Sequence, residues 1–160
     1  MLCGGYIVIT LTDIGPNDLR DVLGLCVEDA QKDFVPTPEG ILARAWAYRD
    51  AAARMYAVRA EGKIAGLTLV YEMGEEPACY CVMEMLVDRK YQNQGIATEA
   101  LRQIVQICGH EGKYPVVELS VDRENTHALR VCEKAGFVDA GYVDPALPQY
   151  RNLIYKFPPV

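Results

Sequence analysis

The chain has 160 residues, of which 51% are hydrophobic and 24% charged, and its formal net charge at pH 7 is -6. This composition is typical of a globular protein, and the length predicts a single domain over residues 1–160. It excludes disordered, collagen-like and disulfide-scaffold chains, and no apolar run reaches the roughly 18 residues of a membrane helix. The negative charge argues against nucleic acid or an anionic membrane as a partner and agrees with a cationic ligand.

The six cysteines are scattered along the chain, and no Cys-x-x-Cys motif occurs. A chain of this size does not need disulfides, so we expect reduced thiols and a cytoplasmic protein. Cys79 and Cys81 are two residues apart and would share one face of a strand, where we interpret them as core or half-buried thiols. Only two histidines are present, so we expect no metal site.

The N-terminal part of the chain predicts a strand followed by a long helix. Residues 6–11 are β-branched and bounded by glycines, which is typical of a strand. Asn17 is a good N-cap, and apolar residues at helical spacing continue from there to Ala30. We therefore expect one helix over this stretch, ending before Pro36.

The next part predicts a helix and three successive antiparallel strands. Pro38 suits the first position of a helix, which we expect over residues 38–49. Residues 55–59 and 63–72 are joined by a short link containing glycine, as in a hairpin. A third extended run covers residues 78–87.

In the C-terminal part the pattern changes to alternating helices and strands. We expect helices over residues 95–108 and 125–135, and strands over residues 116–121, 137–144 and 150–157. The resulting order, β-α-α-β-β-β-α-β-α-β-β, predicts a mixed α/β (α+β) fold around a central sheet.

Residues 87–98 form the most informative stretch, because they connect a predicted strand to a predicted helix. The first N–H groups of a helix are unpaired and carry positive partial charge, and Gly95 and Ala97 would let a ligand approach them closely. Such a turn can bind a phosphate or pyrophosphate, although an ordinary helix start would look the same. Neither a Walker-type loop nor a dinucleotide-binding Gly-x-Gly-x-x-Gly after the first strand is present.

Two motifs in this chain resemble those of a known family. Gln92-x-x-Gly95-x-Ala97 resembles the signature of the GNAT superfamily of acetyl-CoA-dependent N-acetyltransferases, and residues 85–88 resemble the family's fourth strand. Asn125-x-x-Ala128, followed by residues 133–137, is similar to its second signature. The resemblance implies a mostly antiparallel sheet with helices on both faces, and a cleft between splayed fourth and fifth strands that holds acetyl-CoA.

The resemblance also assigns residues to the cofactor. The fourth strand would pair with the pantetheine arm, the N–H groups of the following turn would hold the pyrophosphate, and the start of the later helix would contact the arm. These residues are Met85, Leu86, Val87, Gln92, Asn93, Gln94, Gly95, Ile96, Ala97, Thr98, Asn125 and Ala128.

Acetyl transfer needs a base, because a primary amine has a pKa of about 10.4 and must lose a proton to attack. Glu84 is our candidate for the base or amine anchor, since it shares a strand face with Leu86 and matches an acidic residue of polyamine acetyltransferases. Glu28 is expected to help bind the cationic substrate. The alternative for both carboxylates is an exposed or salt-bridged side chain.

The general acid is a departure from the family pattern, because Cys132 stands where the family usually has a tyrosine. A thiol with a pKa near 8.5 could protonate the leaving CoA thiolate, so Cys132 is a candidate catalytic residue. The alternatives are a merely structural Cys132, another tyrosine such as Tyr142 or Tyr150, or solvent.

Residues 27–35 and 87–92 are most similar to bacterial diamine and spermidine acetyltransferases. We therefore expect transfer of an acetyl group from acetyl-CoA to a primary amine of a small molecule such as spermidine. An aminoglycoside, an amino acid or a protein N-terminus remains an alternative acceptor, and a non-catalytic acyl-CoA-binding module an alternative function. By analogy with relatives, a homodimer is possible.

Overall fold

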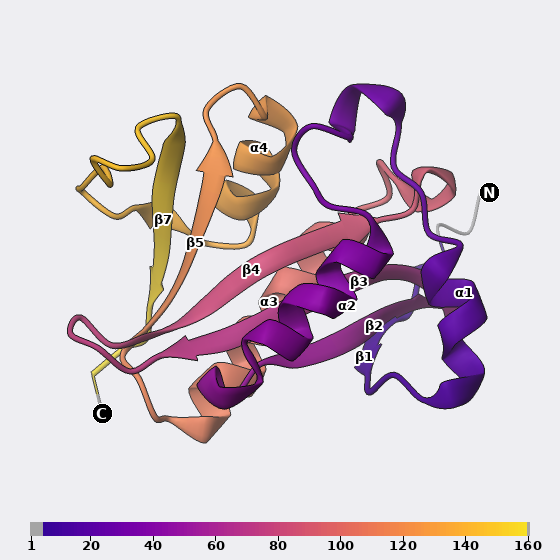
Figure 1. Ribbon diagram of the computed structural model, residues 1–160, viewed down its shortest axis with the longest axis horizontal. Helices are drawn as coiled ribbons and strands as arrows, with labels where there is room; N and C mark the ends of the chain where they lie inside the picture. Colours follow the sequence, from indigo (N-terminus) through magenta and orange to yellow (C-terminus); the bar gives the residue numbers. More distant parts are fainter. Residues whose placement is uncertain (1–4, 160) are drawn as a thin grey trace.

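The computed structural model describes residues 5–159, which form one seven-stranded sheet with helices on both faces (Figure 1). The strand order is β1-β2-β3-β4-β5-β7-β6, and all neighbours are antiparallel except β4 and β5. The predicted fold class is therefore confirmed. The strands are β1 (Ile9–Thr12), β2 (Arg54–Ala60), β3 (Lys63–Met73), β4 (Cys79–Val87), β5 (Val116–Asp122), β6 (Val138–Asp139) and β7 (Tyr150–Lys156).

Four α-helices cover the two faces of the sheet. They are α1 (Leu19–Leu23), α2 (Pro38–Ala47), α3 (Ile96–Glu111) and α4 (Thr126–Lys134). Buried residues of α1 and α2 pack with β3 and Leu86 on one face, which we call the α2 face. Those of α3 and α4 pack with β4, β5 and β7 on the other, the α3 face. Within residues 5–159, no helix is long and apolar enough to cross a membrane.

The feature of the sheet that matters most for function is the divergence of β4 and β5. These two strands pair at two positions only, Tyr80 with Val117 and Cys81 with Glu118. Beyond that point β4 continues along β3, and β5 continues along β7. The facing edges of β4 and β5 thus lie apart, with backbone groups available to another extended chain.

A bulge in β4 determines which side chains point to which face. Leu69 of β3 pairs with Glu84, but the next residue of β3 pairs with Val82, so Met83 is the extra residue. Met83 and Leu86 consequently pack on the α2 face, while Val82 and Met85 pack on the α3 face. Glu84 points to the α2 face, because it pairs with Arg44 of α2.

The prediction of one long first helix is wrong. Helix α1 ends at Leu23, and the chain then runs irregularly to a single 3-10 turn at Asp29–Gln31. The reason is tertiary: Cys26 N donates to Asp88 Oδ2 over 3.0 Å, and Cys26 O accepts from Arg89 N over 2.7 Å. The segment is therefore held against the end of β4, which a continuing helix could not reach.

Two predicted strands are shorter than expected. The first begins only at Ile9, and the strand predicted over residues 137–144 is reduced to Val138–Asp139. The second is cut short because Asp139 Oδ1 accepts from the N–H of Gly141, whose φ is +82°. That turn releases the chain into a loop that returns at β7.

Candidate active site

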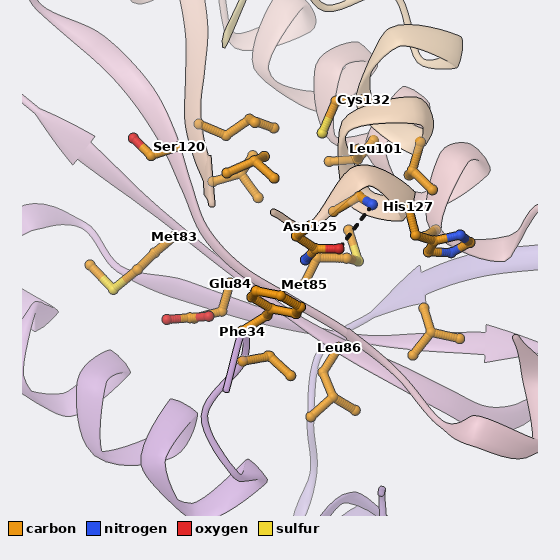
Figure 2. A pocket seen from close by; sticks show the side chains of 18 of the residues that line it. Phe34, Met83, Glu84, Met85, Leu86, Leu101, Ser120, Asn125, His127 and Cys132 are labelled. Carbon is orange, nitrogen blue, oxygen red and sulfur yellow. Dashed lines mark hydrogen bonds between the residues drawn. The ribbon is translucent and has the colours of Figure 1, made fainter. Parts of the chain in front are cut away.

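One cavity of about 810 Å³ lies where β4 and β5 diverge and continues to the start of α3. Its walls come from β4, β5, α4, the turn before α3 and the segment between α1 and α2. Figure 2 shows that it is lined from both faces of the sheet, with Met83 and Glu84 on one side and Asn125 and Cys132 on the other. The cavity therefore passes through the sheet.

The turn before α3 presents free N–H groups to this cavity. Gly95 is the N-cap of α3 with a φ of +77°, so it provides no capping side chain. By contrast, Thr37 and Asn125 cap α2 and α4 with side-chain oxygens. Among the described residues, no acceptor is bonded to the N–H groups of residues 96–98. This sixteen-residue helix thus offers unpaired donors and its positive dipole end to an anion.

Gln92 fixes the start of this turn. Its Nε2 donates to the carbonyl of Val87 over 2.9 Å and to Gln31 Oε1 over 2.8 Å. Gln31 Nε2 donates back to Gln92 Oε1 over 3.1 Å. The two amides therefore connect the turn, the end of β4 and the segment between α1 and α2. Gln31 was not identified from the sequence, because its partner lies 61 residues away.

Most residues that the sequence assigned to the cofactor line this one cavity. Asn125 does so while its Oδ1 accepts from the N–H of Ala128 over 3.2 Å, as predicted for a helix cap. Gln94 does not line the cavity and faces a separate, smaller hollow. The lining members are Met85, Leu86, Val87, Gln92, Asn93, Gly95, Ile96, Ala97, Thr98, Asn125 and Ala128.

Glu84 lines the α2 side of the cavity as a buried carboxylate, 9% exposed. Burial raises its pKa to about 7, opposed by the positive charge of Arg44. Arg44 Nη1 lies 2.6 Å from Glu84 Oε1, and the guanidinium is half-exposed. A carboxyl group with a pKa near neutrality can both accept and release a proton at physiological pH. Arg44 was not identified from the sequence, since it lies on another element, 40 residues from its partner.

Cys132 also lines the cavity but belongs to the apolar core on the α3 face. It is 5% exposed, and burial raises the pKa of its thiol to about 12. A thiol in this state holds its proton more tightly than an ordinary thiol near 8.5. This environment argues against Cys132 as the proton donor.

Glu28 lies outside the cavity. It is an exposed residue just before the 3-10 turn, and its backbone N–H donates to Gln31 Oε1 over 3.2 Å. Glu28 was expected to lie on the first helix. Because α1 ends before it, Glu28 lies in the irregular segment instead. Its neighbours Val27, Gln31 and Phe34 line the cavity instead.

The two ends of the cavity differ in charge. On the α4 side it is lined by His127, Arg130 and Lys134, close to the unpaired N–H groups of α3. On the α2 face the carboxylates of Glu84 and Glu118 line it, with Arg44 as the opposing cation. Glu118 accepts a hydrogen bond from the hydroxyl of Tyr142. Among residues 5–159 no cluster of metal-ligating side chains occurs.

The geometry is that of a protein with a split sheet, whose cavity joins an anion-binding helix start on one side to a buried carboxylate on the other. Comparisons with known proteins agree. Residues 20–137 match the model of the acetyltransferase (GNAT) family. A stretch of 55 residues is 40% identical to a probable N-acetyltransferase, YjcK, of Bacillus subtilis (strain 168); it covers 34% of this chain and 30% of that protein's length.

Solved structures show the same fold at low identity. The spermidine N-acetyltransferase from Vibrio cholerae, in complex with CoA and spermine, is 17% identical, with a TM-score of 0.71 over 92% of this chain and 95% of that one. An aminoglycoside acetyltransferase in complex with coenzyme A and kanamycin is 16% identical, with a TM-score of 0.75 over 93% and 95%. Because the family model matches most of its length, the chain belongs to the acetyltransferase (GNAT) family.

Proposed function

We propose that this chain transfers the acetyl group of acetyl-CoA to a primary amine of a small polycation, such as a diamine or spermidine. The observation that carries the proposal is the single cavity that joins the free N–H groups of α3 to the buried carboxylate of Glu84. One end suits an anionic cofactor and the other a cationic acceptor. The divergence of β4 and β5 provides the passage between them.

At the cofactor end, the N–H groups of residues 93–98 would hold the pyrophosphate of acetyl-CoA. The pantetheine arm would lie between β4 and β5 and bond to backbone groups of Met85, Leu86 and Val87, as an added strand does. Arg130 and Lys134 supply positive charge near the phosphates. This arrangement directs the thioester toward Glu84.

At the acceptor end, Glu84 would take a proton from the ammonium group of the acceptor, directly or through a water molecule, and the resulting neutral amine would attack the thioester. Its raised pKa, about 7, brings it closer to the amine's value near 10.4, which makes it a better base than an ordinary carboxylate. An N–H group of β4 near Leu86 would stabilise the oxyanion of the tetrahedral intermediate.

The departing CoA thiolate must finally be protonated. A proton transfer from Cys132 would be unfavourable, because its pKa is about 12 and that of an ordinary thiol about 8.5. We therefore assign this proton to solvent, which reaches the open cavity. Turnover then requires no tyrosine in place of Cys132.

The preference for a polycation is supported by the carboxylates on the α2 face. Glu118 and Asp122 of β5 line the cavity on the side where Glu84 lies. A molecule with two or more ammonium groups could use Glu84 for the reacting amine and Glu118 for a distant one. Arg44 favours a second candidate, an amino acid whose carboxylate would bind the guanidinium while its amine faces Glu84.

The proposal is tested by measuring CoA thiol release from acetyl-CoA with the full chain and a panel of acceptors. The panel contains spermidine, a diamine, a monoamine of equal chain length, an amino acid and an aminoglycoside. We expect the fastest release with spermidine or the diamine. If acetyl-CoA binds but no amine releases thiol, the chain is a binding module and the proposal is wrong.

A further inference from the structure

Two thiols lie next to each other where β4 and β5 begin to diverge. Cys79 and Cys81 are the first and third residues of β4, and their Sγ atoms are 3.5 Å apart. Cys81 lines the cavity, while Cys79 is buried behind it, 1% exposed. The sequence suggested two ordinary core thiols, and the acetyl-transfer chemistry uses neither.

The surroundings of this pair distinguish its two members. Cys79 Sγ lies 3.9 Å from Glu118 Oε2 and can donate its proton to that oxygen or to Cys81. Cys81 pairs across the strands with Tyr71 of β3. The hydrogen bond with Cys79 lowers the pKa of Cys81, whereas the pKa of Cys79 is raised. Cys81 is therefore the nucleophilic member and faces the cavity.

The other cysteines of the described residues lack such a setting. Cys108 and Cys132 are buried in the core on the α3 face, and burial raises the pKa of their thiols to about 11 and about 12. Cys26 donates to the carbonyl of Val27 over 3.4 Å. Cys3 lies outside the described residues.

We propose that Cys79 and Cys81 form a dithiol modification site, at which hydrogen peroxide entering the cavity closes the pair into an intrastrand disulfide. The Cys81 thiolate attacks one peroxide oxygen, the O–O bond breaks, and one water leaves after protonation, so that Cys81 becomes a sulfenic acid. Cys79 then attacks that sulfur, the S–S bond forms, the S–O bond breaks, and a second water leaves. Two thiols lose two electrons, and one peroxide is reduced to two water molecules.

Geometry permits this closure but makes it labile. Residues two apart on a strand have Cα atoms about 6.6–6.8 Å apart, at the upper end of the range of about 4.4–6.8 Å found in disulfides. The sulfur atoms must also move from 3.5 Å to bonding distance. Disulfides under such constraint are readily reduced, as in reversible redox sites.

The site is tested on the full chain with graded hydrogen peroxide under native conditions. Free thiols are then blocked with iodoacetamide in denaturant, disulfides are reduced, and the released thiols are labelled with N-ethylmaleimide. Trypsin yields a peptide of residues 64–89, which contains Cys79 and Cys81 and no other cysteine. Met73 in the same peptide is 38% exposed, so its oxidation measures the peroxide dose.

We expect Cys79 and Cys81 to acquire the second label together, before half of Met73 is oxidised. In Cys79→Ser, Cys81 should instead be trapped by dimedone as the sulfenic acid, and in Cys81→Ser the reaction at Cys79 should disappear. Cys108→Ser, the control, should behave like wild type. The proposal is overturned if Met73 oxidises while both cysteines keep the first label, or if Cys81 links to another thiol.

The labelling reads the sulfur atoms themselves, so the result does not depend on the proposed acetyl transfer. If either serine variant fails to fold, as judged by circular dichroism, the labelling pattern of the wild-type peptide decides alone.

Discussion

The two ends of the cavity differ in whether backbone or side-chain groups form them. The cofactor end consists mainly of backbone: the N–H groups that open α3 and the unpaired edges of β4 and β5. The acceptor end consists of side chains, with Glu84 and Arg44 as an ion pair and Glu118 held by Tyr142. Backbone groups recognise what all acyl-CoA molecules share, whereas side chains can change the acceptor without changing the fold.

The difference also separates the expected effects of mutation. A change in the backbone-built end should affect binding of the cofactor and hence every acceptor. A change in the side-chain-built end should alter rate, pH dependence or acceptor preference and leave cofactor binding intact. Four substitutions test this separation.

The largest effect is expected for Gly95→Glu. The residue has a φ of +77°, and a carboxylate there would face the cofactor's phosphates at the open end of α3. Repulsion between like charges placed side by side costs several kcal/mol, so we expect the affinity for acetyl-CoA to fall about 1000-fold. The affinity is measured by calorimetry. Gly62→Glu is the matched control, because Gly62 has a φ of +80° and equally open surroundings on a distant hairpin. Equal affinities in the two variants would contradict the site assignment.

Glu84→Gln should lower the rate of acetylation about 100-fold without weakening acetyl-CoA binding. The pKa of Glu84 is about 7, so the carboxylate accumulates as pH rises through 7 and the wild-type rate should rise with it. The rate of the glutamine variant should not show this rise, so the ratio of the wild-type rate to the variant rate should grow from pH 5 to pH 8. Exposed Glu124→Gln serves as the control. An unchanged pH–rate profile in Glu84→Gln would remove Glu84 from the mechanism.

Arg44→Gln should have a smaller effect, through Glu84. Removing the neighbouring positive charge raises the pKa of Glu84 further, so the rising limb of the pH–rate profile should move to higher pH by up to about one unit. Arg49→Gln, on the exposed side of the following turn, should leave the limb in place. If the rising limb of the pH–rate profile stays at the same pH in Arg44→Gln, the ion pair does not set the pKa of Glu84.

The smallest effect is expected for Glu118→Gln. A single partly exposed ion pair contributes about 1 kcal/mol or less, so KM for spermidine should rise about threefold to fivefold. KM for a monoamine of similar length should not change, and neither should kcat. An equal rise in KM for both amines would indicate that Glu118 supports the loop through Tyr142 and does not bind a second ammonium group.

The contrast between the two ends also explains what the sequence could predict. Gly95 and the helix that follows are local features, and the divergence of β4 and β5 came with the family resemblance. Arg44, Gln31 and Glu118 were missed because each acts through partners distant in sequence or on another strand. The position of Glu28 was not predicted for a related reason. Local periodicity favoured a helix through this residue, but the hydrogen bonds between Cys26 and the residues that follow β4 hold the segment in an irregular conformation.

The meeting of β4 and β5 at just two residue pairs divides the sheet into a four-stranded and a three-stranded portion. A pantetheine chain bonded to both edges would complete the sheet with material that is not protein. We then expect the rigidity of the sheet to depend on the cofactor: within residues 82–87 and 119–122, the amide protons that face the gap between β4 and β5 should exchange slowly only in the loaded protein, whereas those that face β3 or β7 should be protected in both states.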